Sequence, residues 1–253
     1  MPKFLARQSR SRVVLLTVMA IALSACAGTS TSAGAGRAGA TSSPDTGLGG
    51  AASAFAKVSS YNFSMTLAGG TFSSMLSMLP TSSAVGDAPF TIGGTITAKP
   101  QEAADIKMIG LHIIEIGGQD YLDMAGTGSF DQITISGTKL AERFSPATMF
   151  ATAINPETVG GYDKVGADTK NGVQADHYQA SSAGLATLGS IAAITGATWT
   201  ADGWVAQDGG HPVSLAIVGT AANKSIVYEV RFDITNVDDP ANKVTVPAKV
   251  TGA

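Results

Sequence analysis

Three histidines are the residues of this sequence with the clearest chemical potential: His112, His177 and His211. A histidine can act as a general base or bind a metal when carboxylates, hydroxyls or further histidines converge on it. Their spacing matches no metal-binding motif, and His112 and Glu115, three residues apart in an expected strand, should point to opposite faces. The chain contains no G-x-S-x-G elbow, P-loop or dinucleotide fingerprint. These patterns predict a protein that is not an enzyme and has no cofactor or metal. A hydrolase that uses His177 or His211 is the least favoured alternative.

His177 lies in the stretch KVGADTKNGVQADHYQ, residues 164–179. Asn171-Gly172 is the preferred pair for a two-residue type I′ turn, because both central positions need a positive φ. A valine lies on each side of this turn and Tyr178 comes later, so two strands can flank it. If Tyr178 packs inward, His177 faces solvent, since neighbouring residues of a strand point to opposite faces. The stretch is therefore interpreted as a hairpin whose histidine has no catalytic role.

Most of the remaining pattern is typical of short strands separated by glycines. Apolar and polar residues alternate with the period of two that marks a half-buried strand, most clearly in IVYEVRFDI, residues 226–234. The expected strands are 61–67, 90–98, 105–109, 111–116, 121–124, 133–135, 204–205, 211–218, 226–234 and 244–246, with Val250 finishing the sheet. The expected helices are 51–58, 71–80, 145–154 and 182–196, and 71–80 fits a loop that forms a lid equally well.

These elements predict an α+β fold: a curved, mostly antiparallel sheet with helices packed on one side. Glycine pairs such as Gly93-Gly94 are interpreted as turns or bulges, and the pair Asp238-Asp239 as part of a solvated loop.

The N-terminus has the features of a bacterial lipoprotein signal. Lys3 and three arginines precede an apolar run at 13–23, which is too short to span a bilayer. The run ends in Leu23-Ser24-Ala25-Cys26, which resembles a lipobox, and Cys26 is the only cysteine. We therefore expect residues 1–25 to be a signal peptide and Cys26 to be lipidated on the extracytoplasmic side of the cell membrane. An ordinary secretory signal with an incidental cysteine is the alternative.

Residues 26–50 comprise the lipid anchor and a tether rich in Ala, Gly, Ser and Thr, which cannot bury enough apolar surface to fold. Residues 51–253 are expected to form one domain. Loss of residues 1–25 removes four of the 16 basic residues and none of the 19 acidic ones, which leaves a net charge of −7. An acidic surface argues against nucleic acid as a partner and against electrostatic docking on a membrane. Membrane attachment is therefore assigned to Cys26.

Charged residues make up only 14% of the chain, and apolar residues are concentrated in three segments: MLSML (75–79), TMFATAI (148–154) and LATLGSIAAI (185–194). Such segments either form the core or line an apolar cavity between sheet and helices. The flexible thioether of methionine suits the second role, because it adapts to irregular partners.

Together these features resemble the LolA/LolB-like superfamily, and most closely the LppX/LprG type of actinobacterial lipoproteins. The resemblance covers roughly residues 51–253, and its most specific parts are the Asn-Gly-Val…His-Tyr hairpin and the Asp-Gly…Pro-Val strand pair. The residues that carry it are the lipobox at Cys26, Tyr61-Asn62-Phe63, Asp120-Tyr121-Leu122, Asn171-Gly172-Val173 with His177-Tyr178, Trp204-Val205 before Asp208-Gly209 and Pro212-Val213, and Phe232-Asp233-Ile234 before Val244-Thr245-Val246-Pro247. The sequence departs from the family at 71–89 and in the Ala/Gly-rich helix at 182–198.

The resemblance implies a strongly curved, mostly antiparallel half-barrel whose concave face is covered by helices that enclose an apolar cavity. It also implies a carrier that binds a lipid or acylated ligand and takes part in its transport, with a membrane transporter as a candidate partner. The candidate cavity residues are Phe63, Met65, Leu67, Met75, Met78, Leu79, Met149, Phe150, Leu185, Leu188 and Ile191. The alternative is an anchored interaction or sensor domain whose half-barrel is filled by side chains and which binds a protein partner.

Overall fold

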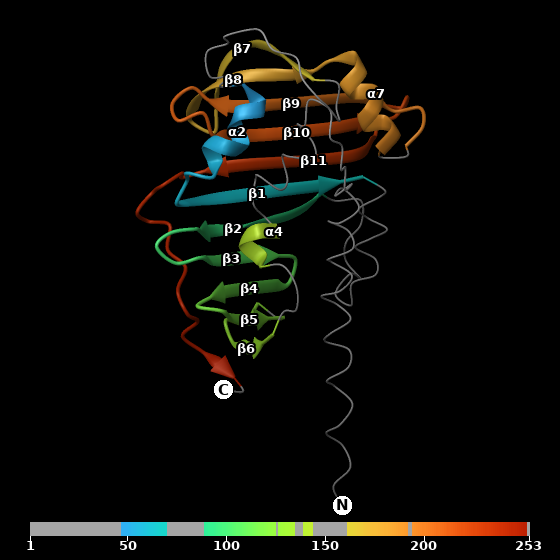
Figure 1. Ribbon diagram of the computed structural model, residues 1–253. Coiled ribbons are helices and arrows are strands. Elements are labelled where there is room, and N and C mark those ends of the chain that lie inside the picture. Colours follow the sequence, from blue (N-terminus) through green and yellow to red (C-terminus); the bar gives the residue numbers. More distant parts are fainter. Residues whose placement is uncertain are drawn as a thin grey trace, which may run out of the picture.

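The computed structural model describes residues 47–69, 89–124, 126–134, 139–143, 161–191 and 194–251, with the backbone alone described for 143 and 187–191. Within these residues, twelve strands form one sheet in the order β12-β6-β5-β4-β3-β2-β1-β11-β10-β9-β8-β7 (Figure 1). The strands are Ser60–Ala68 (β1), Phe90–Thr97 (β2), Ala103–Met108 (β3), Leu111–Ile116 (β4), Gln119–Asp123 (β5), Phe130–Ile133 (β6), Tyr162–Lys170 (β7), Val173–Ala180 (β8), Thr198–Ala206 (β9), Pro212–Thr220 (β10), Ile226–Thr235 (β11) and Val250–Thr251 (β12). The predicted mostly antiparallel, curved sheet is confirmed as an open sheet, in which β12 alone pairs in parallel, with β6.

Strand β1 lies inside the sheet and joins its two halves. It pairs antiparallel with β2 on one side and with β11 on the other, so that Met65 lies between Ile92 and Phe232. Strands β2–β6 extend from β1 in chain order, and strands β10–β7 extend from β11 in reverse order. Two consecutive series of hairpins therefore meet at the pairing of β1 with β11.

The alternation predicted for these strands gives the sheet two chemically different faces. Buried and part-buried residues alternate along the middle of β1, and Phe63, Met65 and Leu67 are the buried set. We call the face that carries these three side chains and Phe232 the apolar face. The opposite face, which carries Asn62, Ser64 and Thr66 on β1, is the polar face.

Three short helices belong to the described residues: Leu48–Phe55 (α2), Leu140–Arg143 (α4) and Ser182–Ile191 (α7). Helix α2 contacts β9 and β10, α4 contacts β3, and α7 contacts β8 and β9. Figure 1 shows α2 and α4 on the same side of the sheet. Ser181 caps the start of α7, where its side-chain oxygen accepts a hydrogen bond of 3.3 Å from the Gly184 amide.

The predicted hairpin around Asn171-Gly172 is confirmed. Both residues have positive φ, 52° and 79°, as a type I′ turn requires, and they connect β7 to β8. The side-chain nitrogen Nδ2 of Asn171 donates to the Val213 carbonyl at 3.1 Å and to Asp233 Oδ1 at 3.1 Å. These bonds attach the tip of the hairpin to β10 and β11. Strand β7 is the edge of the sheet, and its register shifts between Lys164 and Gly166.

Several predicted boundaries are wrong, for identifiable physical reasons. Residues 244–246 are not a strand. Val244 packs against a small cluster formed by Ile114, Tyr121 and Phe130, so an apolar residue is needed here although this segment forms no strand pairing. The helix expected at 51–58 begins three residues earlier, at Leu48, which is buried. Strand β6 ends at Ile133, where the expected strand 133–135 begins.

The pair Gly93-Gly94 lies inside β2, within the strand expected at 90–98, and forms neither of the two features expected of glycine pairs, a turn or a bulge. Gly94 is required sterically, because a Cβ added there would overlap the Asp105 carbonyl oxygen of β3. A Cβ added at Gly93 would meet only the Phe63 carbonyl oxygen, at 3.3 Å. The two glycines therefore occupy the same strand for different reasons.

We predict that Gly94→Ala lowers the free energy of unfolding by about 1–3 kcal/mol, because the backbones of β2 and β3 must separate to admit the methyl group. Gly93→Ala is the matched control, and we expect it to change stability by less than about 1 kcal/mol. Urea denaturation of both variants measures the difference. Equal losses at the two positions would contradict the steric explanation.

Candidate functional site

The apolar face is the candidate site that the sequence predicts, and Phe63, Met65 and Leu67 lie on it. Their side chains are 4%, 2% and 7% exposed. The Phe63 ring stacks on Phe232 with 5.7 Å between ring centroids and an angle of 11° between the planes. At the start of β1, Tyr61 packs edge-on against Phe55 of α2 at 4.8 Å, and burial raises the pKa of the tyrosine.

This cluster extends across most of the sheet. It joins buried side chains of β1–β5 and β8–β11 with those of α2 and α4, from Leu122 on β5 to Tyr178 on β8. Leu185 of α7 is part-buried and packs against it. Apolar packing of this extent excludes water from the side chains that form the cluster.

The other predicted cavity residues cannot be placed on this face. Leu188 and Ile191 lie in α7, of which only the backbone is described at those positions. The candidates Met75, Met78, Leu79, Met149 and Phe150 lie outside the described residues, as do the predicted helices 71–80 and 145–154 and the lipidation candidate Cys26.

A buried carboxyl group interrupts the apolar face at β4. Glu115 accepts a hydrogen bond of 2.8 Å from the backbone amide of Leu140, the first residue of α4. Burial raises the pKa of Glu115, and the neighbouring carboxylates of Asp120 and Glu102 act in the same direction. The sequence signal for this contact is Glu115 itself, a charged residue at a position of β4 where the alternation calls for an apolar one.

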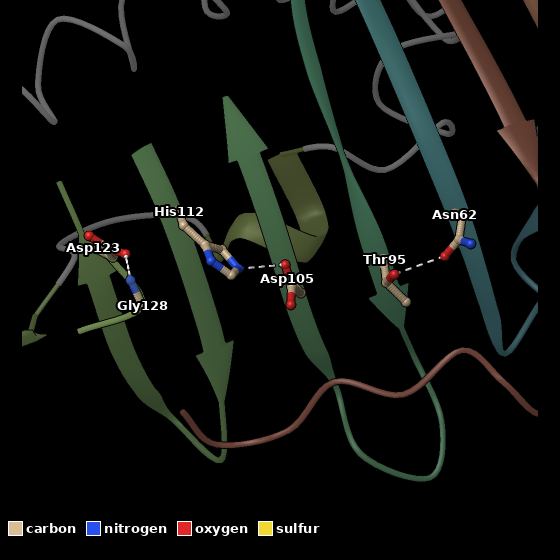
Figure 2. Close-up of polar contacts among 6 residues, drawn as sticks. All are labelled: Asn62, Thr95, Asp105, His112, Asp123 and Gly128. Carbon is tan, nitrogen blue, oxygen red and sulfur yellow. Dashed lines mark hydrogen bonds and ion pairs between the residues drawn. The ribbon is translucent and has the colours of Figure 1, made fainter. Parts of the chain in front are cut away.

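The polar face carries hydrogen-bonding side chains on five adjacent strands, β1 to β5 (Figure 2). Thr95 donates to Asn62 Oδ1 at 2.8 Å, and His112 Nε2 is 2.8 Å from Asp105 Oδ1. Asp123, which is buried, accepts from the Gly128 amide at 2.6 Å and so closes the turn between β5 and β6. His112 and Glu115 point to opposite faces, as predicted.

His177 lies at the far end of the polar face, on β8. Its Nε2 is 2.9 Å from Asp202 Oδ1, and its ring stacks on Trp204 at 4.6 Å with an angle of 6°. The ammonium group of Lys170 lies 4.5 Å from the centroid of the Trp204 ring. Tyr178 is buried in the main cluster, so the predicted orientation of the hairpin is confirmed, although His177 is half-buried instead of fully in solvent.

Two catalytic uses of a histidine, activation of a protein nucleophile and metal binding, require further side chains beside the ring. His112 is hydrogen-bonded to Asp105 and His177 to Asp202, and neither ring contacts a hydroxyl or thiol nucleophile among the described residues. No group of three metal-binding side chains occurs in the part of the chain that the structure describes. His211 follows the Gly209-Gly210 turn, as expected, and burial lowers its pKa.

Asp238, expected in a solvated loop, has a structural role at the start of β1. It adopts a positive φ of 56°, and its Oδ1 accepts hydrogen bonds from the amides of Ser59 at 2.6 Å and Ser60 at 3.1 Å. Its own amide donates to the Ser60 carbonyl at 2.8 Å. The turn after β11 is therefore fixed to the first residue of β1, a contact across 178 positions that no local pattern in the sequence predicts.

No helix in the described ranges has the length and hydrophobicity needed to cross a membrane.

Comparison with known proteins gives a similarity of structure. No protein-family model and no curated protein matches the sequence. The lipoprotein LppX of Mycobacterium tuberculosis is 13% identical, with a TM-score of 0.45, over 78% of this chain and 98% of its own. LprF of Mycobacterium bovis is 14% identical, with a TM-score of 0.46, over 81% of this chain and 98% of its own. MucB, solved in complex with MucA(peri), is 8% identical, with a TM-score of 0.36, over 81% of this chain and 61% of its own. The predicted resemblance to the LppX/LprG type is thus found again, as a likeness of fold that says nothing about a ligand.

We predict that Glu115 makes stability depend on pH. The neutral form is favoured in the fold, so the group costs nothing below its ordinary pKa of 4.5, and stability falls as pH rises from there through the raised pKa. Glu115→Gln, which keeps an acceptor for the Leu140 amide, should equal the parent protein near about pH 4 and exceed its stability near about pH 7. Glu115→Ala leaves that amide unpaired and should lose about 1–3 kcal/mol at both values. Thermal unfolding at the two pH values measures these changes, and a Gln variant less stable than the parent at the higher pH would contradict them.

Proposed function

We propose that this chain is a membrane-anchored envelope lipoprotein. In this proposal it binds a lipid or lipidated molecule at the apolar face and takes part in the transport of that molecule across the cell envelope, without enzymatic activity. The observation that carries the proposal is the extent of the apolar face, whose buried side chains come from β1–β5 and β8–β11. The lipobox at Cys26 and the sequence resemblance to LppX/LprG-type lipoproteins support export, anchoring and a carrier role.

Shielding of hydrocarbon is the mechanism. Each methylene moved from water into an apolar space contributes about 0.8 kcal/mol, so about ten buried methylenes would contribute about 8 kcal/mol. Phe63, Met65 and Leu67 would form the floor of the binding space, and α7 would border it through Leu185, Leu188 and Ile191. We assign the remaining cover of the face to the Met-rich segments, through Met75, Met78, Leu79, Met149 and Phe150. A membrane transporter is the candidate source or recipient of the cargo.

A second candidate function is an anchored interaction or sensor domain that binds a protein partner. The observation that favours it is the close packing of the apolar face, where Phe63 and Met65 are 4% and 2% exposed and Phe63 stacks on Phe232. A face filled by its own side chains would leave no space for an acyl chain. The two functions differ in whether lipid accompanies the purified protein.

We predict that the chain with Cys26→Ser, purified from its own host, carries a lipid that organic extraction and native mass spectrometry detect. Leu185→Trp, which adds bulk where α7 meets the apolar face, should lower the recovered lipid by about tenfold. Ala186→Trp adds the same ring at an exposed position of the same helix and should leave recovery unchanged. Absence of lipid from the parent protein, together with a protein partner captured by crosslinking in cells, would favour the second function.

We also predict that Cys26 supplies the membrane attachment. Cys26→Ser should remove both the incorporation of a fatty-acid label and the recovery of the protein in the membrane fraction, because no other thiol can be acylated. Ser24→Ala keeps a small residue in the lipobox and should retain both properties. Continued labelling of the Cys26→Ser chain would refute the lipobox assignment.

A further inference from the structure

The polar face contains a notch centred on Gly93. Strand register places Ser64 of β1 and Lys107 of β3 beside this glycine, and Thr91 and Thr95 flank it on β2. Because Gly93 has no side chain, an open depression of about 460 Å³ lies between these residues. It is lined by Thr91, Gly93, Gly94, Thr95, Asp105, Lys107 and Met108.

The steric need for glycine is much weaker at Gly93 than at Gly94. Gly94 cannot carry a Cβ because of the Asp105 carbonyl, whereas a Cβ at Gly93 would need only a small shift of Phe63. Glycine in the interior of a strand weakens it and often marks a place where a ligand or another backbone approaches. Apart from that 3.3 Å contact no atom of the described residues lies within 4 Å of a Cβ built at Gly93, so the space above this glycine is open to a ligand.

The notch offers both donors and acceptors of hydrogen bonds. Lys107 and Thr91 are exposed, and their side chains have no polar partner among the described residues, so both can donate. Thr95 gives its proton to Asn62, which leaves the Thr95 oxygen as an acceptor. Asp105 uses Oδ1 for His112, which leaves Oδ2 as a second acceptor. The positions of Asn62, Thr95, Asp105 and His112 are shown in Figure 2.

The combination of donors and acceptors in the notch determines which class of ligand fits it. An anion would be attracted by Lys107 but repelled by Asp105, and a cation would meet the reverse. A hydroxyl group both donates and accepts, so a ligand with several hydroxyls can satisfy the ammonium, the carboxylate and the threonines together. We propose that the Gly93 notch binds a polyhydroxylated ligand of the class of a sugar unit. The site lies on the face opposite to the apolar cluster, so the proposal does not depend on lipid binding.

The test uses the full chain with the substitution Cys26→Ser. Glucose, mannose and N-acetylglucosamine are titrated into it separately, and two-dimensional NMR monitors the backbone amides. Glycine amides lie in a separate region of such spectra, so Gly93 and Gly94 report directly. We expect at least one saccharide to shift these amides and that of Lys107, with saturation at about millimolar concentration. Absence of shifts from all three at about 50 mM would overturn the proposal. So would the same pattern from inorganic phosphate, because attraction to Lys107 alone would then explain it.

Two variants and one control complete the test. Gly93→Thr fills the notch and should abolish the shifts, and Lys107→Met removes one donor and should weaken binding by about tenfold. Lys57→Met removes an exposed lysine outside the sheet and should bind like the parent protein. The dispersion of each spectrum shows whether the variant is folded. A folded Gly93→Thr chain that binds as the parent does would overturn the assignment.

Discussion

The antiparallel pairing of β1 with β11 is the contact on which the rest of the sheet depends. It pairs Met65 with Phe232, 167 positions further along the chain, and Leu67 with Val230, 163 positions further along the chain. The entropy cost of this closure must be offset by burial. A shift of one residue in this pairing would turn β11 over and place Arg231 and Asp233 among Phe63 and Met65. The hydrogen bonds of Asp238 to Ser59 and Ser60 fix the end of this pairing, so a single turn secures the register of both halves.

The sequence was sufficient to predict elements whose pattern is local. The alternation of Tyr228, Val230, Phe232 and Ile234 predicted β11 and its buried side, and Asn171-Gly172 predicted the hairpin between β7 and β8. Both signals are complete within a few residues, because a strand's faces and a type I′ turn depend on adjacent positions.

Features that depend on distant partners were missed or assigned wrongly. The strand expected at 90–98 includes Gly93-Gly94, but only the close approach of Asp105 explains why position 94 must be glycine. The roles of Glu115 and Asp238 depend on hydrogen bonds from the amides of Leu140 and Ser59, which lie far away in the sequence, so the sequence around each carboxylate does not predict them. Val244 shows the converse case, in which apolar residues at strand spacing pack against Phe130 and its neighbours without entering a ladder.

The edge strand β7 bears on how copies of this protein coexist. A strand edge of nine residues that pairs with no further strand among the described residues is a template for strand addition from a neighbouring molecule. Here the edge is charged at Asp163, Lys164, Asp168 and Lys170, and its register shift at Lys164/Gly166 interrupts the flat run of backbone groups. Such an edge resists the growth of continuous intermolecular sheets, so copies of the chain can remain separate particles even at high concentration.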